Sequence, residues 1–326
     1  MATKRKRSSG LRRLRLLAVL ILVYCLVAVG YYFLPWSVRR HVYTGLPRLD
    51  RTLVRTGFRI VSEWDLLGLR GRDCSVALDR SMGADHAYGG YPSQGFKLLD
   101  RVKVLENLSY TAGYSESMRN PLWVAYRVFD VRNMDSGARP SRFKVDRRTE
   151  ARVSHDDYLG SGYDRGHMAP NHAIATRYGR AGQRETFLMS NVIPQVPSIN
   201  RHLWKDLEML VSRKYGRYFG EVWVVTGPVF TKPVGKLDSG VSIPSGYYKI
   251  IADEDRGKLR VLAFLVEADL PPYSRIRPQL VSVDELEALT GLDFFPGLDD
   301  EAQEKIESRP AGRLWPWVIP AIRHAF

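Results

Sequence analysis

The residues of this 326-residue chain that could do chemistry together lie between positions 162 and 208. His167 follows Arg165 by two positions, and Asn191, Asn200 and Glu208 come later in the same stretch. Imidazole titrates near neutral pH and can take a proton from an attacking water. Amide and carboxylate oxygens suit a hard ion such as Mg²⁺ and its water ligands, and a guanidinium suits phosphate. This set predicts hydrolysis of a phosphodiester with the help of one metal ion.

The spacing from Asn200 to Glu208 predicts that both lie on one helix. Eight positions advance roughly 80° around an ideal helix, so Glu208 can turn toward a metal on Asn200 and accept hydrogen bonds from its water ligands. Simpler interpretations exist for both residues. Asn200 would also serve as a helix N-cap, and Glu208 as part of a solvated helix face.

Five apolar segments around this stretch have the β-branched and aromatic composition of strands. They are Val102–Leu105, Leu122–Phe129, Glu221–Thr226, Tyr247–Ala252 and Leu259–Val266. Strand and helix segments that alternate in this way predict an α+β domain, with a central, mostly antiparallel sheet flanked by helices. Ser282 and Glu285 form a capping box, and Gly291 suits the C′ position, so a short helix is expected between them. The tail from Arg309 to Phe326 is expected either to pack back on the core or to fray.

The N-terminal region predicts a membrane anchor. A basic head, residues 1–15, precedes an uncharged apolar run at 16–34 that ends in Pro35 and Trp36. At about 1.5 Å per residue this run approaches the thickness of a bilayer core, so segment 16–36 is predicted to be a transmembrane signal anchor. The basic load on its N-terminal side predicts a cytoplasmic N-terminus and an extracytoplasmic catalytic domain, in the periplasm or at the cell surface.

Two other interpretations of this region are less favoured. A cleaved signal peptide would have a shorter apolar core and a small-x-small cleavage site, and a mitochondrial presequence would be an amphipathic, arginine-spaced helix. A catalytic domain in the intermembrane space of an organelle is a less favoured location for the anchored chain. Residues 37–95 are expected to be a linker with a partly helical segment at 53–67, and residues 96–326 to form the catalytic domain.

Composition limits the partners and the cofactors. The formal net charge is +14, and seven of the basic residues lie in the head, so the rest of the chain keeps a moderate basic excess. Such an excess favours polyanionic partners such as nucleic acid or anionic lipid. Cys25 and Cys74 are the two cysteines, too few for a disulfide framework and without the spacing of a zinc site.

The run 164–170, with 190–195 and 200–208, closely resembles the DNA/RNA non-specific endonuclease family. The resemblance extends to 123–126, 225–228, 243–249 and 284–287, and so covers roughly residues 96–298. It implies a ββα-metal finger on an antiparallel sheet and hydrolysis of DNA and RNA to 5′-phosphate products. The implied cofactor is Mg²⁺, with Mn²⁺ or another divalent ion as alternatives.

The resemblance also implies roles for individual residues. His167 matches the general base, Asn200 the metal ligand, and Asn191 an asparagine that supports the network of metal, water and phosphate. Glu208 falls in the matched helix, where it would hold metal-bound water.

Two arginines are expected to bind phosphate. Arg165 is preferred for that role over a salt bridge with Asp164, which is expected to be structural. Arg142 matches a second phosphate-binding arginine less closely, because other arginines lie nearby, at Arg139, Arg147 and Arg148.

The partners expected on these grounds are DNA and RNA, through the phosphate backbone, and a membrane, through the N-terminal helix. A homodimer is left open. Two competing interpretations remain: a membrane-tethered nucleic-acid-binding module that has lost catalysis, and an enzyme that applies the same chemistry to another phosphodiester.

Overall fold

The computed structural model describes residues 3–32, 75–77, 86–94, 101–130, 138–231, 233–255 and 258–315, with scattered residues between 34 and 56. Two compact units divide the chain, Met1–Leu69 and Arg70–Phe326. Most of the segment predicted to be partly helical at 53–67, most of the linker and Cys74 lie outside the described residues.

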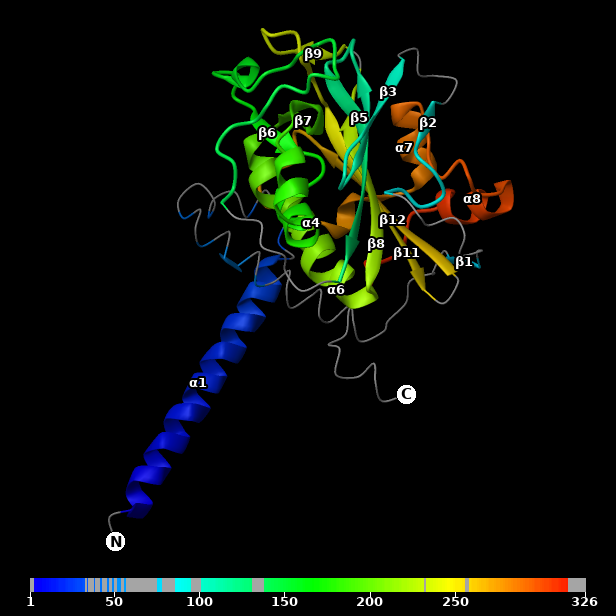
Figure 1. Ribbon diagram of the computed structural model, residues 1–326. Helices are drawn as coiled ribbons and strands as arrows, with labels where there is room; N and C mark the ends of the chain where they lie inside the picture. The colour runs from blue at the N-terminus through cyan, green and yellow to red at the C-terminus, as the bar shows by residue number, and fades with distance from the viewer. Residues whose placement is uncertain are drawn as a thin grey trace. The chain divides into compact units, whose positions relative to one another are not determined.

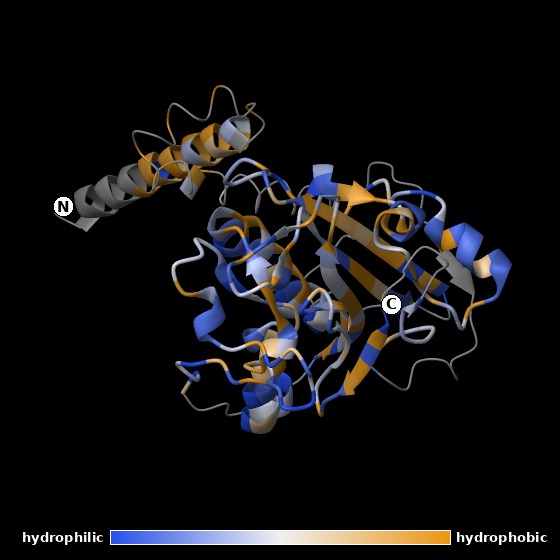
Figure 2. Cartoon of the chain, turned by 90° about the horizontal axis from the view of Figure 1, so that it is seen from above, coloured by the Kyte–Doolittle hydropathy of each residue, from blue (hydrophilic) through white to orange (hydrophobic). Residues whose placement is uncertain are grey.

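The first unit contains helix α1 (Thr3–Tyr32), which carries the apolar run (Figure 2). Its stretch Leu14–Tyr31 is long and apolar enough to cross a membrane, a property that a signal sequence shares. Leu16 is 61% exposed and Leu22 59%, and most of the apolar stretch of α1 is likewise uncovered, although Ala28 is buried. The apolar helix expected from the sequence is therefore present, and it begins within the basic head.

The second unit is built on an antiparallel sheet (Figure 1). Its strands pair in the order β1-β12-β11-β8-β5-β4-β3, and the short β13 also pairs with β12. The bounds are β1 (Ser75–Ala77), β3 (Val102–Glu106), β4 (Thr111–Ser115), β5 (Asn120–Phe129), β8 (Glu221–Val229), β11 (Gly246–Asp255), β12 (Lys258–Glu267) and β13 (Leu280–Val281). All five predicted strands are confirmed, and so is the α+β class with a central antiparallel sheet.

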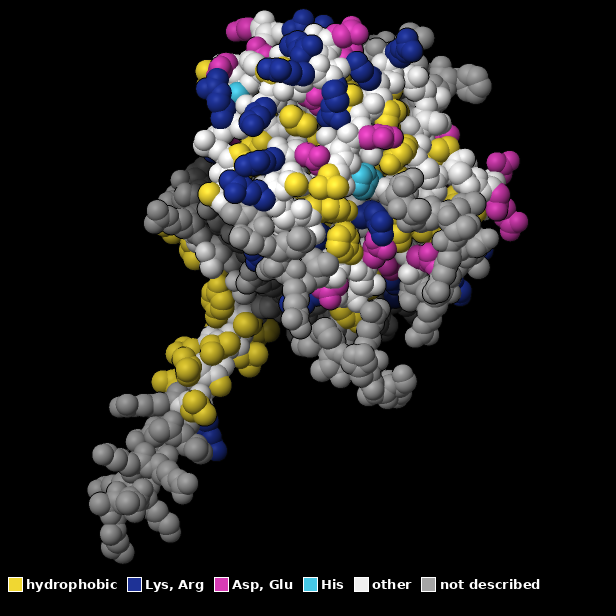
Figure 3. Space-filling view, viewed as in Figure 1, with side chains coloured by type: hydrophobic (Ala, Val, Ile, Leu, Met, Phe, Trp, Pro, Cys, Tyr) yellow, Lys and Arg dark blue, Asp and Glu magenta, His cyan; other side chains and the backbone are white. Residues whose placement is uncertain are grey.

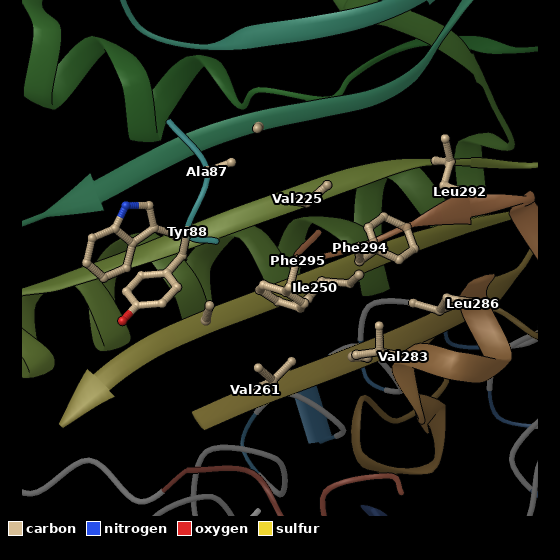
Figure 4. Packing of buried hydrophobic residues seen from close by; sticks show 14 of the residues in the cluster. Ala87, Tyr88, Val225, Ile250, Val261, Val283, Leu286, Leu292, Phe294 and Phe295 are labelled. Atoms are coloured by element: carbon tan, nitrogen blue, oxygen red, sulfur yellow. The ribbon is translucent and has the colours of Figure 1, made fainter. Parts of the chain in front are cut away.

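One face of this sheet is covered by α7 (Val283–Thr290) and α8 (Asp300–Glu307). Val283 and Leu286 of α7 pack against Ile250 and Val261 of the sheet, as Figure 4 shows. Burying each such side chain contributes about 1.5–3 kcal/mol. The predicted capping of α7 is confirmed, since the Ser282 hydroxyl accepts a hydrogen bond from the Glu285 amide at 3.1 Å.

The opposite face is covered by a second helical layer. It consists of α4 (Asn171–Glu185), α5 (Lys205–Leu210) and α6 (Gly216–Phe219), with π-helical segments η5 (Ile199–Trp204) and η6 (Val211–Tyr215) on either side of α5. The Trp204 ring packs edge-on against Tyr247 of β11, with centroids 5.8 Å apart. Trp315 packs against Tyr215 and Phe219, so the described part of the C-terminal tail does return to the core.

Three two-stranded pairs lie outside the main sheet. They are β2 (Ser93–Gln94) with β14 (Leu292–Asp293), β9 (Gly235–Lys236) with β10 (Ser242–Ile243), and β6 (Asp164–His167) with β7 (Val192–Gln195). Also described are three 3₁₀ turns, η3 (Asp156–Tyr158), η4 (Met189–Asn191) and η7 (Arg277–Gln279).

Candidate active site

The β6–β7 pair and the helix that follows it carry the candidate catalytic residues. The two strands are antiparallel, with His167 opposite Val192 and Asp164 opposite Gln195. Segment η5 begins at Ile199, four positions after β7 ends. A long insertion that contains α4 joins the two strands (Figure 1), so the pairing itself brings the two halves of the motif together.

The hairpin is fastened to the main sheet by a tyrosine. The hydroxyl of Tyr247 accepts a hydrogen bond from the Val196 amide at 3.0 Å and donates one to the Pro194 carbonyl at 3.4 Å. Tyr247 is fully buried in β11. The end of β7, where η5 begins, therefore has a fixed position relative to the sheet.

Gly166 is required by close packing inside the hairpin. A Cβ atom at this position would collide with the side chain of Gln195. Gln195 is 0% exposed, and its side-chain oxygen and nitrogen find no hydrogen-bond partner among the described residues. A side chain enclosed in this way has little freedom to move aside.

The Gly166→Ala variant is therefore expected to lose about 1–3 kcal/mol of unfolding free energy, the usual cost of overpacking. Equilibrium denaturation of both proteins measures this loss. Gly235→Ala is the matched control, because its Cβ would make only ordinary contacts, at 3.7 Å from Ile243. Equal stability of the Gly166→Ala variant and the wild type would contradict the packing.

The side chain of Asn191 binds the backbone of two earlier segments. Its Oδ1 accepts from the Ala169 amide at 2.8 Å, and its Nδ2 donates to the carbonyls of Ala169 and Thr186, each at 3.0 Å. The side chain is fully buried. Asn191 therefore holds the segment that directly follows His167 against β7.

His167 lies between two aromatic rings. The centroids of Phe143 and Phe187 are 5.0 and 5.1 Å from that of its imidazole. Within the described ranges its Nε2 atom is buried and has no hydrogen-bond partner. Burial, and then the positive charge of Arg139, lower the pKa of His167 to about 3. The imidazole is thus neutral at neutral pH and holds an unused nitrogen, the state that a proton acceptor needs.

Asn200 and Asp164 form a polar pair beside the hairpin. The Asn200 Nδ2 atom donates to Asp164 Oδ2 at 2.9 Å, and Arg201 donates to both carboxylate oxygens, at 2.8 and 2.5 Å. Burial alone would raise the pKa of Asp164, but the hydrogen bonds from Arg201 and Asn200 outweigh it and hold the pKa low. Asp164 is therefore ionised, as its expected structural role requires.

The same pair fixes the orientation of the Asn200 amide. An ionised carboxylate can only accept hydrogen bonds, so the nitrogen of the amide must face Asp164 and the oxygen must face away. Oxygen is the atom that Mg²⁺ prefers, and an ion of this kind keeps several water ligands. Asn200 thus fits a hard divalent ion.

Glu208 interacts electrostatically with a buried lysine, Lys249, to which the sequence analysis gave no role. Lys249 of β11 is 0% exposed, and its Nζ lies 4.4 Å from the centroid of the Trp204 ring and 3.4 Å from the hydroxyls of Tyr126 and Thr226. Burial raises the pKa of Glu208 and lowers that of Lys249, and the charge of each residue opposes the shift of the other. The alternation of β11 explains the position: Lys249 points to the helical layer, whereas Tyr248 and Ile250 join the opposite core.

Arg165 shares a face of β6 with His167, because the two residues are two positions apart in a strand. Its Nε donates to the His155 carbonyl at 2.9 Å, and its guanidinium lies over the Tyr158 ring. One terminal nitrogen is buried and unpaired with respect to the described residues. The alternative pairing with Asp164 is not formed, since Arg201 occupies that carboxylate.

Arg142 and Arg139 have different surroundings. Arg142 is exposed and paired with Asp156. Arg139 lies over the Phe187 ring, 5.5 Å from its centroid, and its charge acts on both His167 and Glu208. Arg139 is therefore the arginine upstream of the motif that the structure brings to His167. The sequence indicated a phosphate-binding arginine in this region, but it did not distinguish Arg139 from the neighbouring arginines.

Comparison with known proteins finds similarity to nucleases. The model of the family described as DNA/RNA non-specific endonuclease matches residues 89–301. Among curated proteins, the mitochondrial nuclease EXOG of Xenopus laevis is 32% identical over 224 residues, which are 63% of this chain and 61% of that protein. A nuclease of Nostoc sp. is 34% identical over 223 residues, 64% of this chain and 79% of that protein.

A solved structure gives the same result at the level of the fold. A chain in the crystal structure of the EndoG/EndoGI complex, described as showing the mechanism of EndoG inhibition, superposes with a TM-score of 0.55 at 29% identity. The match covers 64% of this chain and 91% of that one. The matched region spans about three fifths of the EXOG relative's own length.

Proposed function

The chain belongs to the DNA/RNA non-specific endonuclease family, and on that premise we propose that it hydrolyses phosphodiester bonds of DNA and RNA to 5′-phosphate products. The observation that carries the proposal is the neutral imidazole of His167, whose Nε2 has no hydrogen-bond partner among the described residues. The same strand, β6, also holds Asp164, the carboxylate that orients Asn200.

The proposed mechanism assigns one task to each group. His167 removes a proton from the water that attacks phosphorus. The phosphate, as an anion, favours the protonated imidazole and so raises its pKa toward the working pH. A divalent cation on Asn200, Mg²⁺ by preference, would supply positive charge for the leaving 3′ oxygen.

The remaining residues position the catalytic groups or neutralise the charge of the phosphate. Glu208 accepts hydrogen bonds from water near Asn200, and Lys249 supplies the buried positive charge that favours its carboxylate form. Asn191 positions His167 through the backbone that follows it. Arg139 and Arg165 donate to the non-bridging phosphate oxygens, which charge-assisted hydrogen bonds suit.

The two candidate arginines upstream of the motif give a sharp test. Arg139→Ala is expected to lower kcat/KM on the order of 10²-fold, the cost of losing one donor to the developing charge. Arg142→Ala, in which an exposed pair with Asp156 is lost, is expected to change it by less than about threefold. Steady-state cleavage of a short labelled duplex measures both. A larger loss in Arg142→Ala than in Arg139→Ala would reverse the assignment.

The basic surface supports nucleic acid as the substrate. Lys and Arg side chains gather over the part of the unit that holds β6, β7 and β9 (Figure 3). Contacts of this kind address the phosphate backbone, which positions a protein without encoding sequence. Weak sequence preference and binding that falls with salt concentration are the expected consequences.

The apolar helix supports a membrane location. We propose that segment 16–36 anchors the chain, with the head in the cytoplasm and the nuclease domain outside it. Protease treatment of intact cells and of lysed cells tests this topology. Two results together would contradict it: the domain is digested only after lysis, and the whole protein is recovered in the cytoplasmic fraction.

A further inference from the structure

A second group of oxygen ligands lies on the side of the sheet covered by α7 and α8. Asp284 and Glu287 belong to α7, and Glu307 is the last residue of α8. One carboxylate oxygen from each residue lies within 4.8 Å of the others. Acidic side chains also gather at the edge of the molecule where Figure 1 draws α8 (Figure 3). The group is separate from the helical layer that carries Asn200.

The buried member of this group has no partner. Glu307 is only 5% exposed, and its Oε1 finds no hydrogen-bond partner in the part of the chain that the structure describes. A buried, unpartnered carboxylate oxygen is costly, and its presence beside two other carboxylates requires compensation. Glu287 is only partly compensated, because its Oε1 accepts one hydrogen bond, from the Phe294 amide at 2.7 Å.

The three carboxylates of this group repel one another when they are ionised, and no positive side chain that the structure describes offsets the repulsion. Among the described residues, no lysine or arginine forms an ion pair with Asp284, Glu287 or Glu307. Either protons or a cation must relieve the repulsion.

We propose that Asp284, Glu287 and Glu307 bind one hard divalent cation, Ca²⁺ by preference, which ties α7 to α8. Ca²⁺ contacts oxygens at about 2.4 Å, so two oxygens on one ion lie up to about 4.8 Å apart. Three carboxylates can supply up to six oxygens, and water completes the shell. Asp284 is exposed and gives the ion a way in. The site is structural, because α7 and α8 pack on the core through Leu286 and Ile306.

Calcium binding to the full chain in detergent tests the proposal. The background is Asn200→Ala, which removes the proposed catalytic ligand, and the readouts are titration calorimetry with CaCl₂ and the melting temperature. One bound ion is expected, with a rise of roughly 5–10 °C in Tm at a hundredfold excess over Kd. Glu307→Gln and the exposed Asp284→Asn are each expected to weaken binding at least tenfold.

Glu301→Gln is the matched control, since Glu301 is an exposed carboxylate on the same helix outside the group. It is expected to keep the affinity of the background protein. A Tm that does not respond to Ca²⁺ in the background protein would overturn the proposal and leave shared protons as the compensation. Equal affinity in Glu307→Gln, Asp284→Asn and Glu301→Gln would overturn it too. Neither readout depends on nuclease activity.

Discussion

Replacing His167 with alanine is expected to lower kcat for phosphodiester cleavage by about 10²–10⁴-fold, the usual contribution of a general base. The imidazole is neutral, and its buried Nε2 makes no hydrogen bond to any described residue, so this nitrogen is the group that can accept the proton of the attacking water. The measurement is the initial rate of plasmid cleavage at saturating Mg²⁺ and neutral pH.

The loss must be separated from damage to the fold. His167 packs against Phe143 and Phe187, so alanine leaves a gap that costs about 0.5–3 kcal/mol of stability. Circular dichroism and Tm report this cost directly. His172→Ala is the matched control, because His172 is an exposed histidine at the start of α4. A His167→Ala rate close to that of His172→Ala would remove His167 from the mechanism.

Replacing Asn200 with alanine is expected to lower kcat on the order of 10³-fold and to raise the Mg²⁺ concentration needed for half-maximal rate. A Lewis-acidic ion supplies several kcal/mol of charge stabilisation at the phosphate, and 1.4 kcal/mol corresponds to a factor of ten. The fold should survive, since Asp164 keeps both hydrogen bonds from Arg201. The measurement is a titration of cleavage rate with MgCl₂.

Two further variants show whether the amide oxygen is the operative atom. Asp164→Asn no longer requires the nitrogen of Asn200 to face it, so the amide can turn and the apparent affinity for Mg²⁺ should fall. Asn107→Ala, at an asparagine that pairs with Arg148 between β3 and β4, should leave the titration unchanged. An unaltered Mg²⁺ dependence in Asn200→Ala would place the ion on other ligands.

Local patterns in the sequence predicted the elements that depend on local physics. The five strands follow from β-branched and aromatic runs, and α7 follows from the cap at Ser282 and the glycine at Gly291, which adopts φ 71°. The short strand β4 was not predicted, because Gly113 interrupts its pattern. The Cβ that Gly113 lacks would collide with Trp123, so this glycine is set by a contact that only the folded sheet creates.

The parts of the site that sequence could not supply depend on long-range contacts. Arg139 and Arg142 look alike in the chain, and only the packing of Arg139 on Phe187 and the pairing of Arg142 with Asp156 separate them. Lys249 lies in an apolar strand far from Glu208 in sequence, and the sheet brings its charge under the helix. The bonds of Asn191 to Ala169 and Thr186 likewise become visible only when the hairpin is formed.

Cleavage of supercoiled plasmid and of single-stranded RNA by the full chain, with Mg²⁺ and with excess EDTA, tests the proposed activity most directly. Cleavage of both polymers with Mg²⁺, 5′-phosphate ends on the products, and no cleavage with EDTA are the expected results. A folded protein that shifts DNA on a gel but cuts neither polymer under any divalent ion would contradict the nuclease and indicate a nucleic-acid-binding module in its place.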